Sequence, residues 1–268
     1  MHLGTDAGEA SGQLGVPREH ALAYVLCALF VGFFVAAEVL GGKLIRFTLF
    51  GIGPKDLGLG DGVEFAATAG ILAFPLTFVM TDIVNEYFGR PVVRLFTWIA
   101  IAVNLLLQPV IRAAIAIPAI SFTPGISDDD MQRGYQIALG QTTSIVFASL
   151  AAFAIAQWLD VWVFTWLRRS TGGKYLWLRA QGSTIVSQMI DTVAVIYLAF
   201  VVIPMVTGGQ AWTIGNAFSV SATNYVYKFL IALLSTPALY LVHSAVDRYL
   251  GKQTAEALVH RAHPLDPD

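Results

Sequence analysis

Two ionisable side chains, Asp191 and Lys228, lie inside stretches of sequence that are otherwise apolar. Counted from the start of each stretch, Asp191 is about eight residues deep and Lys228 about ten, and a helix rises about 1.5 Å per residue. A charged side chain near the centre of a membrane costs about 2.5–3.5 kcal/mol on insertion scales. Lys228 therefore needs an acid, a ligand or a water-filled cavity beside it, and Asp191 and Glu38 are the candidate partners. A static ion pair and a pair linked to substrate or protons both fit this pattern.

One face of the stretch 64–88 combines an aromatic ring with carboxylates and an amide. Its members are Phe78, Asp82, Asn85 and Glu86. Residues three or four apart lie on the same side of a helix, so these side chains are expected to act together. A hydrated helix end whose carboxylates meet Arg90 and Arg94 is the structural alternative to a ligand site.

Three further apolar stretches carry polar faces. Gln188 precedes Asp191 by three residues, and Asn104 precedes Gln108 by four. Ser221 and Asn224 share a face with Lys228. A carboxylate accepts two parallel N–H bonds, and an amide both donates and accepts. Such a pocket suits a polar heterocycle that has both donors and acceptors, although it does not identify one.

The composition indicates that lipid surrounds much of the chain. Its 268 residues are 56% hydrophobic and 13% charged, with a mean hydropathy of +0.66. A soluble domain carries roughly twice that charged fraction. A membrane span needs about 20 mostly apolar residues. Six stretches qualify: 22–41, 64–88, 92–113, 139–167, 183–206 and 218–245. We therefore expect an all-α, polytopic membrane bundle of about six transmembrane helices, with a tight hairpin at Gly89-Arg90-Pro91.

The ends and the charge distribution predict the topology. Residues 1–20 are polar and glycine-rich and are expected to form a disordered tail, residues 21–250 a single transmembrane domain, and residues 251–268 a C-terminal tail. With six spans, both tails and the second and fourth loops share one side, which carries ten of the sixteen Lys and Arg residues. The positive-inside rule places that side, and both termini, in the cytoplasm.

Several function classes lack support in the sequence. No nucleophile-elbow, zinc-protease or Walker motif is present, so we expect no enzyme activity and no catalytic residues. The histidines lie in tails or at span ends, and there is a single cysteine, so neither a metal site nor a cofactor is expected. A net charge of −2 gives no reason to expect nucleic acid as a partner. A solute carrier with a polar pocket fits best.

Three blocks of the sequence resemble the queuosine precursor transporter family, also called the vitamin uptake transporter family. They are FPLTFVMTDIVNEYFGRPVVR (74–94), ASLAAFAIAQWLDVWVF continuing through TGGKYLWLRAQGSTIVSQMIDT (148–192), and YKFLIALLSTPALYLV (227–242). The first span and the glycine-rich loop after it match poorly, so the resemblance says nothing of Glu38. Glu38 is expected near the outer end of the first span, where contact with interfacial water makes it the least informative of the acids.

The resemblance implies import of 7-cyano- or 7-aminomethyl-7-deazaguanine, a small deazapurine substrate, through the inner cell membrane. With the polar-face argument, it implies the following substrate-binding residues: Phe78, Asp82, Asn85, Glu86, Asn104, Gln188, Asp191, Asn224 and Lys228. One acid would accept hydrogen bonds from the guanine N–H groups, and an amide would donate one to the ring carbonyl. Lys228, paired with an acid, would couple transport to an ion or organise the site. A homo-oligomer is compatible with this class.

Two other functions remain open at this point. One is the substrate-binding subunit of an energy-coupling-factor vitamin importer, which has a similar size and number of spans. The other is a membrane protein that does not transport, such as an enzyme or a scaffold. Co-purification with an ATPase module would favour the first, and failure of every purine analogue to bind would favour the second.

Overall fold

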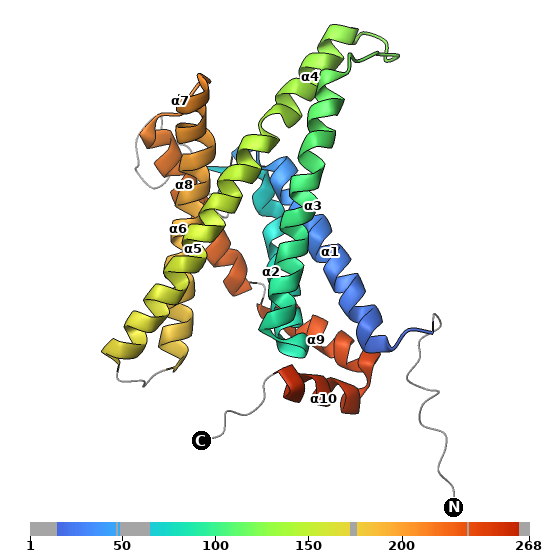
Figure 1. Cartoon of the computed structure of the whole chain (residues 1–268), viewed down its shortest axis with the longest axis vertical. Helices are drawn as coiled ribbons and strands as arrows, with labels where there is room; N and C mark the ends of the chain where they lie inside the picture. Colours follow the sequence, from blue (N-terminus) through green and yellow to red (C-terminus); the bar gives the residue numbers. More distant parts are fainter. Residues whose placement is uncertain (1–14, 47, 49–64, 172–175, 235, 263–268) are drawn as a thin grey trace, which may run out of the picture. The chain divides into compact units, whose positions relative to one another are not determined.

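The computed structural model describes residues 15–46, 48, 65–171, 176–234 and 236–262, and these are mostly helical (Figure 1). The chain divides into two compact units. Unit 1 comprises Met1–Ala36, Leu72–Val103 and Leu230–Asp268, and unit 2 comprises Ala37–Ile71 and Asn104–Phe229. Three of the described α-helices contribute residues to both units: α1 (Arg18–Leu40), α3 (Arg90–Ala116) and α8 (Ile214–Leu234).

Unit 1 is built around an apolar cluster shared by helices from both ends of the chain. Besides parts of α1 and α3 it contains α2 (Phe74–Phe88), α9 (Thr236–Leu250) and α10 (Lys252–Ala262). The buried members of the cluster include Phe30, Ile83, Val84, Phe96 and Val246. The turn between α2 and α3 is Gly89 at φ 79°, a left-handed conformation that glycine adopts without strain. The hairpin expected at Gly89-Arg90-Pro91 is therefore confirmed.

The segment expected to be a C-terminal tail is largely helical. Helix α10 packs against α2 and α9, and its Ala255 and Leu258 are buried in the unit 1 cluster. The expectation failed because α10 is short and polar on average, so only the tertiary packing of its apolar face stabilises it. The N-terminal tail is also shorter than expected, because α1 begins at Arg18. Residues 1–14 and 263–268 lie outside the described residues.

Unit 2 consists mainly of two long helices that pack along each other, α5 (Thr142–Ser170) and α6 (Leu176–Tyr197), seen in yellow and gold in Figure 1. Helix α6 continues through a π-helix, Leu198–Val202, into α7 (Ile203–Thr207). Helices α4 (Asp128–Gly140) and α8 (Ile214–Leu234) complete the unit. Its apolar cluster joins α5, the π-helix and α8 and includes Ile145, Ala148, Phe200 and Val220.

A short antiparallel sheet modifies the expected all-α fold. Strands β1 (Leu44–Arg46) and β2 (Ala66–Thr68) pair with Ile45 opposite Ala67, and a 3₁₀ helix (Ala69–Ala73) follows β2. The beginning of the expected span 64–88 is therefore not α-helical. The acidic residues Asp128, Asp129 and Asp130 form the first turn of α4, where Ser127 and Asp130 make a capping box. Carboxylates are favourable at a helix N-terminus, which explains this start.

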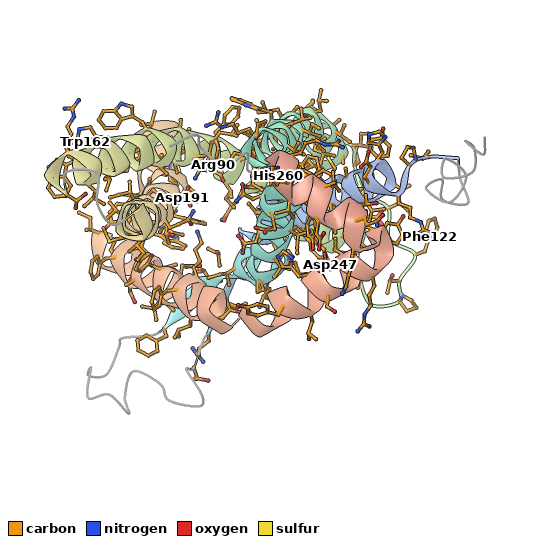
Figure 2. The ribbon with its side chains drawn as sticks, turned by 90° about the horizontal axis from the view of Figure 1, so that it is seen from below. Arg90, Phe122, Trp162, Asp191, Asp247 and His260 are labelled. Carbon is orange, nitrogen blue, oxygen red and sulfur yellow. The ribbon has the colours of Figure 1, made fainter. Side chains whose placement is uncertain are left out.

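Within the described residues, five helical runs are long and apolar enough to cross a membrane. They are Arg18–Leu40, Ala69–Phe88, Arg90–Ala116, Asp128–Ala156 and Ile185–Thr207. The sixth expected span, 218–245, falls on α8 and α9, and residue 235 between them is outside the described residues. Large apolar side chains are widely exposed, including Leu106 at 71% and Trp162 at 55%, the latter labelled on α5 in Figure 2. Lipid-facing helices expose such side chains.

Candidate functional site

An ion pair between Lys228 and Asp191 joins α8 to α6 in unit 2. The Nζ of Lys228 lies 3.4 Å from Oδ2 of Asp191 and donates a hydrogen bond of 3.1 Å to Oγ1 of Thr192. Thr192 uses its own proton to donate to the carbonyl of Gln188 at 2.8 Å, so its oxygen is free to accept from the ammonium. Only 8% of Lys228 is exposed. The structure thus pairs the lysine with one of its two candidate partners (Asp191 is labelled in Figure 2).

The second candidate partner, Glu38, is also in this cluster. Glu38 is 8% exposed, and its Oε1 accepts a hydrogen bond of 2.7 Å from Ser149 on α5. Its Oε2 is buried and has no hydrogen-bond partner among the described residues. The charges of Asp191 and Lys228 both act on the Glu38 carboxyl group. We call Glu38, Ser149, Asp191, Thr192 and Lys228 the charged cluster.

The chain holds Glu38 in place through a close backbone contact. Glu38 lies near the end of α1, directly after Ala37. Gly70 approaches the carbonyl oxygen of Ala37 so closely that a Cβ atom at position 70 would clash with it. The sheet brings this glycine there, because the amide of Ala69 donates to the carbonyl of Lys43 at 2.7 Å just before β1. The sheet of β1 and β2 therefore helps to position the buried carboxylate of Glu38.

One face of α8 lines the interior of unit 2. Ser221, Asn224 and Lys228, expected to share a face, are exposed by 1%, 3% and 8%. Asn224 donates to the carbonyl of Val220 at 2.8 Å, and its Oδ1 accepts a bond of 3.3 Å from Thr68 on β2. This polar stripe thus contacts the sheet through Asn224 and the α6 ion pair through Lys228.

The other expected site residues of unit 2 occupy different environments. Asn104 and Gln108 on α3 are buried at 3% and 7% exposure, and Gln108 donates to the carbonyl of Asn104. Gln188 is half-buried on α6, one turn before Thr192. Buried amides within a span need partners or a ligand, because hydrocarbon offers them none.

The expected site residues of α2 belong to unit 1. Asp82 is exposed within the chain, whereas Asn85 and Glu86 are half-buried. The side chain of Phe78 lies outside the described residues. Since these residues and the charged cluster lie in separate units, whether they form one pocket stays a prediction.

A hydrogen-bond network that the sequence did not indicate lies at the end of α2. The hydroxyl of Tyr87 donates to Oδ1 of Asp247 at 2.6 Å and lies 3.1 Å from Nδ1 of His243, both on α9. The Tyr87 and His243 rings are 5.3 Å apart, and Tyr87 is only 2% exposed. Tyr87 was one of several candidates to stack on a ligand ring, but its ring and hydroxyl contact α9 instead.

Each unit also contains a cavity. In unit 1 a cavity of about 530 Å³ lies beside the Tyr87 network, with Glu86, Lys252 and His260 among its lining residues (Asp247 and His260 are labelled in Figure 2). In unit 2 a cavity of about 250 Å³ is lined by Gln141, Ser144 and Thr207 and by the stacked rings of Phe200 and Trp212. Neither lining includes a member of the charged cluster.

Sequence reasoning named Glu38 only as a possible partner of Lys228, and it did not indicate Ser149 or Thr192. Glu38 was placed near the outer end of its span, where water would make it uninformative, and it was left out of the expected binding residues. Only the contact of the Ala37 carbonyl with Gly70 shows that this helix end is covered. Ser149 and Thr192 carry no separate signal, because single hydroxyls in membrane helices commonly bond within the bundle.

Apolar helices around a buried cluster of opposite charges define a multi-pass membrane protein of the kind in which ionisable groups mark substrate or ion pathways. Residues 68–242 match the family model described as "Putative vitamin uptake transporter". The chain belongs to this transporter family, as its sequence motifs indicated.

Three curated relatives extend this comparison. The "Probable queuosine precursor transporter" of Bacillus subtilis is 31% identical over 175 residues, which is 65% of this chain and 70% of that protein. The "Queuosine precursor transporter" of Escherichia coli is 26% identical over 196 residues, 72% of this chain and 81% of that protein. The "Probable queuosine precursor transporter" of Haemophilus influenzae is 25% identical over 201 residues, 75% and 78% of the two chains. No solved structure matches the chain.

Proposed function

We propose that this protein imports queuosine precursors, 7-cyano- or 7-aminomethyl-7-deazaguanine, across the inner cell membrane into the cytoplasm. The observation that carries the proposal is the charged cluster in a chain of this family: Lys228 and Asp191 are paired 3.4 Å apart inside a membrane helix bundle. Burying two charges where lipid surrounds the protein is costly, so such groups are usually functional. The names of the three relatives supply the substrate.

In this proposal the substrate meets polar groups from several helices. A carboxylate accepts the neighbouring N–H groups of the guanine edge, and an amide such as Asn104, Gln188 or Asn224 meets the ring carbonyl. Phe78, Asp82, Asn85 and Glu86 of unit 1 are also proposed to bind the substrate. Lys228 neutralises Asp191 and organises the acids. Both termini lie in the cytoplasm, as the distribution of basic residues favours.

The test is uptake of radiolabelled 7-cyano- and 7-aminomethyl-7-deazaguanine into proteoliposomes that contain only this protein. Wild type should accumulate label, and Asp191→Asn and Glu86→Gln should reduce the rate at least tenfold while the protein still inserts and purifies. Asp129→Asn, an exposed acid in the first turn of α4, is the matched control and should transport normally. Unchanged uptake by both variants would refute the proposed pocket. Uptake only when an ATPase module is added would instead favour an energy-coupling-factor subunit.

A further inference from the structure

The carboxylate of Glu38 is the acidic group among the described residues that has a buried oxygen without a hydrogen-bond partner. Its Oε1 is held by Ser149 at 2.7 Å, but its Oε2 is buried without a hydrogen-bond partner in the described part of the chain. Buried polar groups are hydrogen-bonded in the large majority of cases, and each exception needs an explanation. An unprotonated oxygen in this position calls for a proton, a cation or a ligand donor.

The charges around Glu38 decide between these possibilities. Two charged groups among the described residues act on it, Asp191 from α6 and Lys228 from α8, while α5 contributes the neutral Ser149. Lys228 already bonds Asp191 and Thr192. With both acids ionised, these three described side chains would together carry a net charge of −1. Removing such a charge from water costs far more than neutralising it with a proton.

A metal cation fits the site less well than a proton does. Hard cations require several oxygen ligands at once, typically six or more. No group of three or more acidic, histidine or cysteine side chains that could hold a metal occurs among the described residues. A proton needs only the free oxygen itself, and a protonated Glu38 would make the cluster neutral.

We propose that Glu38 is the proton-coupling residue of this transporter, which binds a proton at Oε2 from the outer solution and releases it to the cytoplasm with each substrate molecule. This inference rests on the proposed function and adds the coupling ion and its binding group. The step is balanced: one O–H bond forms at Glu38 and the same bond breaks after the transporter has turned inward. Ser149 acts as a positioning residue, because it fixes the carboxyl group through the other oxygen.

The decisive variant is Glu38→Gln, which imitates the protonated carboxyl in shape and charge. In proteoliposomes, wild type should accumulate labelled 7-cyano-7-deazaguanine when the outside is more acidic than the inside. The ratio of inside to outside concentration should rise about tenfold for each pH unit of the gradient, since one pH unit is a tenfold difference in proton activity. Glu38→Gln should lose this accumulation but still exchange internal unlabelled for external labelled substrate at equal pH. Asp129→Asn should behave like wild type. Ser149→Ala should keep the response but shift the pH at which it is half-maximal.

The outcomes separate this inference from the proposed function. If wild type neither exchanges nor accumulates deazaguanines, the proposed function fails. If wild type exchanges them but ignores the pH gradient, or responds to a sodium gradient in its place, the proton assignment is overturned while the function stands. A Glu38→Gln protein that keeps the full pH response would also overturn it. Equilibrium exchange by the same variant shows that the protein is folded, so a lost pH response is interpretable.

Discussion

The two units each contain a buried polar network, and the networks differ in how completely they are satisfied. In unit 1 the Tyr87 hydroxyl lies within hydrogen-bond distance of both Asp247 and His243. In unit 2 the charged cluster is bonded through Asp191, Thr192 and Ser149 but leaves one oxygen of Glu38 without a partner. A satisfied network stabilises its helices, whereas an unsatisfied group implies a missing ion, proton or ligand. We therefore predict a structural role for the first network and a role in transport for the second.

The largest effect should follow from breaking the ion pair of unit 2. Asp191→Ala leaves the Lys228 ammonium buried without its acid, which costs about 3–5 kcal/mol in comparable buried pairs. The purified protein should therefore melt at a clearly lower temperature. The double variant Asp191→Leu with Lys228→Met removes both charges and should regain most of that stability but transport nothing. A double variant that still imports deazaguanines would show that the pair is purely structural.

A smaller effect is expected from Gly70→Ala, which tests how Glu38 is positioned. The new methyl group would clash with the Ala37 carbonyl, and overpacking of this kind costs about 1–3 kcal/mol. Uptake should fall several-fold because the adjacent carboxylate moves away from Ser149. Gly215→Ala on α8 is the matched control, since nothing lies within 4 Å of the added atom. Equal uptake by the two alanine variants would argue against a positioning role for the sheet.

The smallest effect should come from Tyr87→Phe in unit 1. The change removes one hydroxyl while keeping the ring, and a hydrogen bond contributes about 0.5–1.5 kcal/mol net. Because Asp247 is only half-buried, water can replace the lost donor. The melting temperature should drop slightly, and uptake per folded molecule should stay at the wild-type level. A large loss of uptake with an unchanged melting temperature would show that the unit 1 network takes part in transport and is not only structural.

The sequence predicted those features that arise within a single segment of the chain, or that a large free-energy cost makes necessary. The Gly89 turn follows from the conformational freedom of glycine, and the pairing of Lys228 follows from the cost of an ammonium in hydrocarbon. The face of α8 with Ser221 and Asn224 follows from helical spacing. None of these requires knowledge of which helices are neighbours.

Features that depend on neighbouring segments were missed or left open. Helix α10 was expected to be a tail, because its stability comes from burying Ala255 and Leu258 against α2 and α9. Strands β1 and β2 are three residues each, too short for their alternation to be recognised. Glu38 was expected near water, because nothing in its own span reveals that Gly70 covers the end of α1.

The sequence by itself indicated a helical membrane protein and required an acid, a ligand or a water-filled cavity beside Lys228, because placing polar and charged side chains in lipid costs free energy. Its motifs indicated the transporter family. Only the tertiary structure decided that Asp191 is the partner of Lys228 and that Glu38 joins the pair with one oxygen unsatisfied. Hydrogen bonds and ion pairs form over about 3 Å between residues on different helices, 37 positions apart for Asp191 and Lys228 and 111 for Glu38 and Ser149, and the spacing of residues within one helix does not encode such contacts.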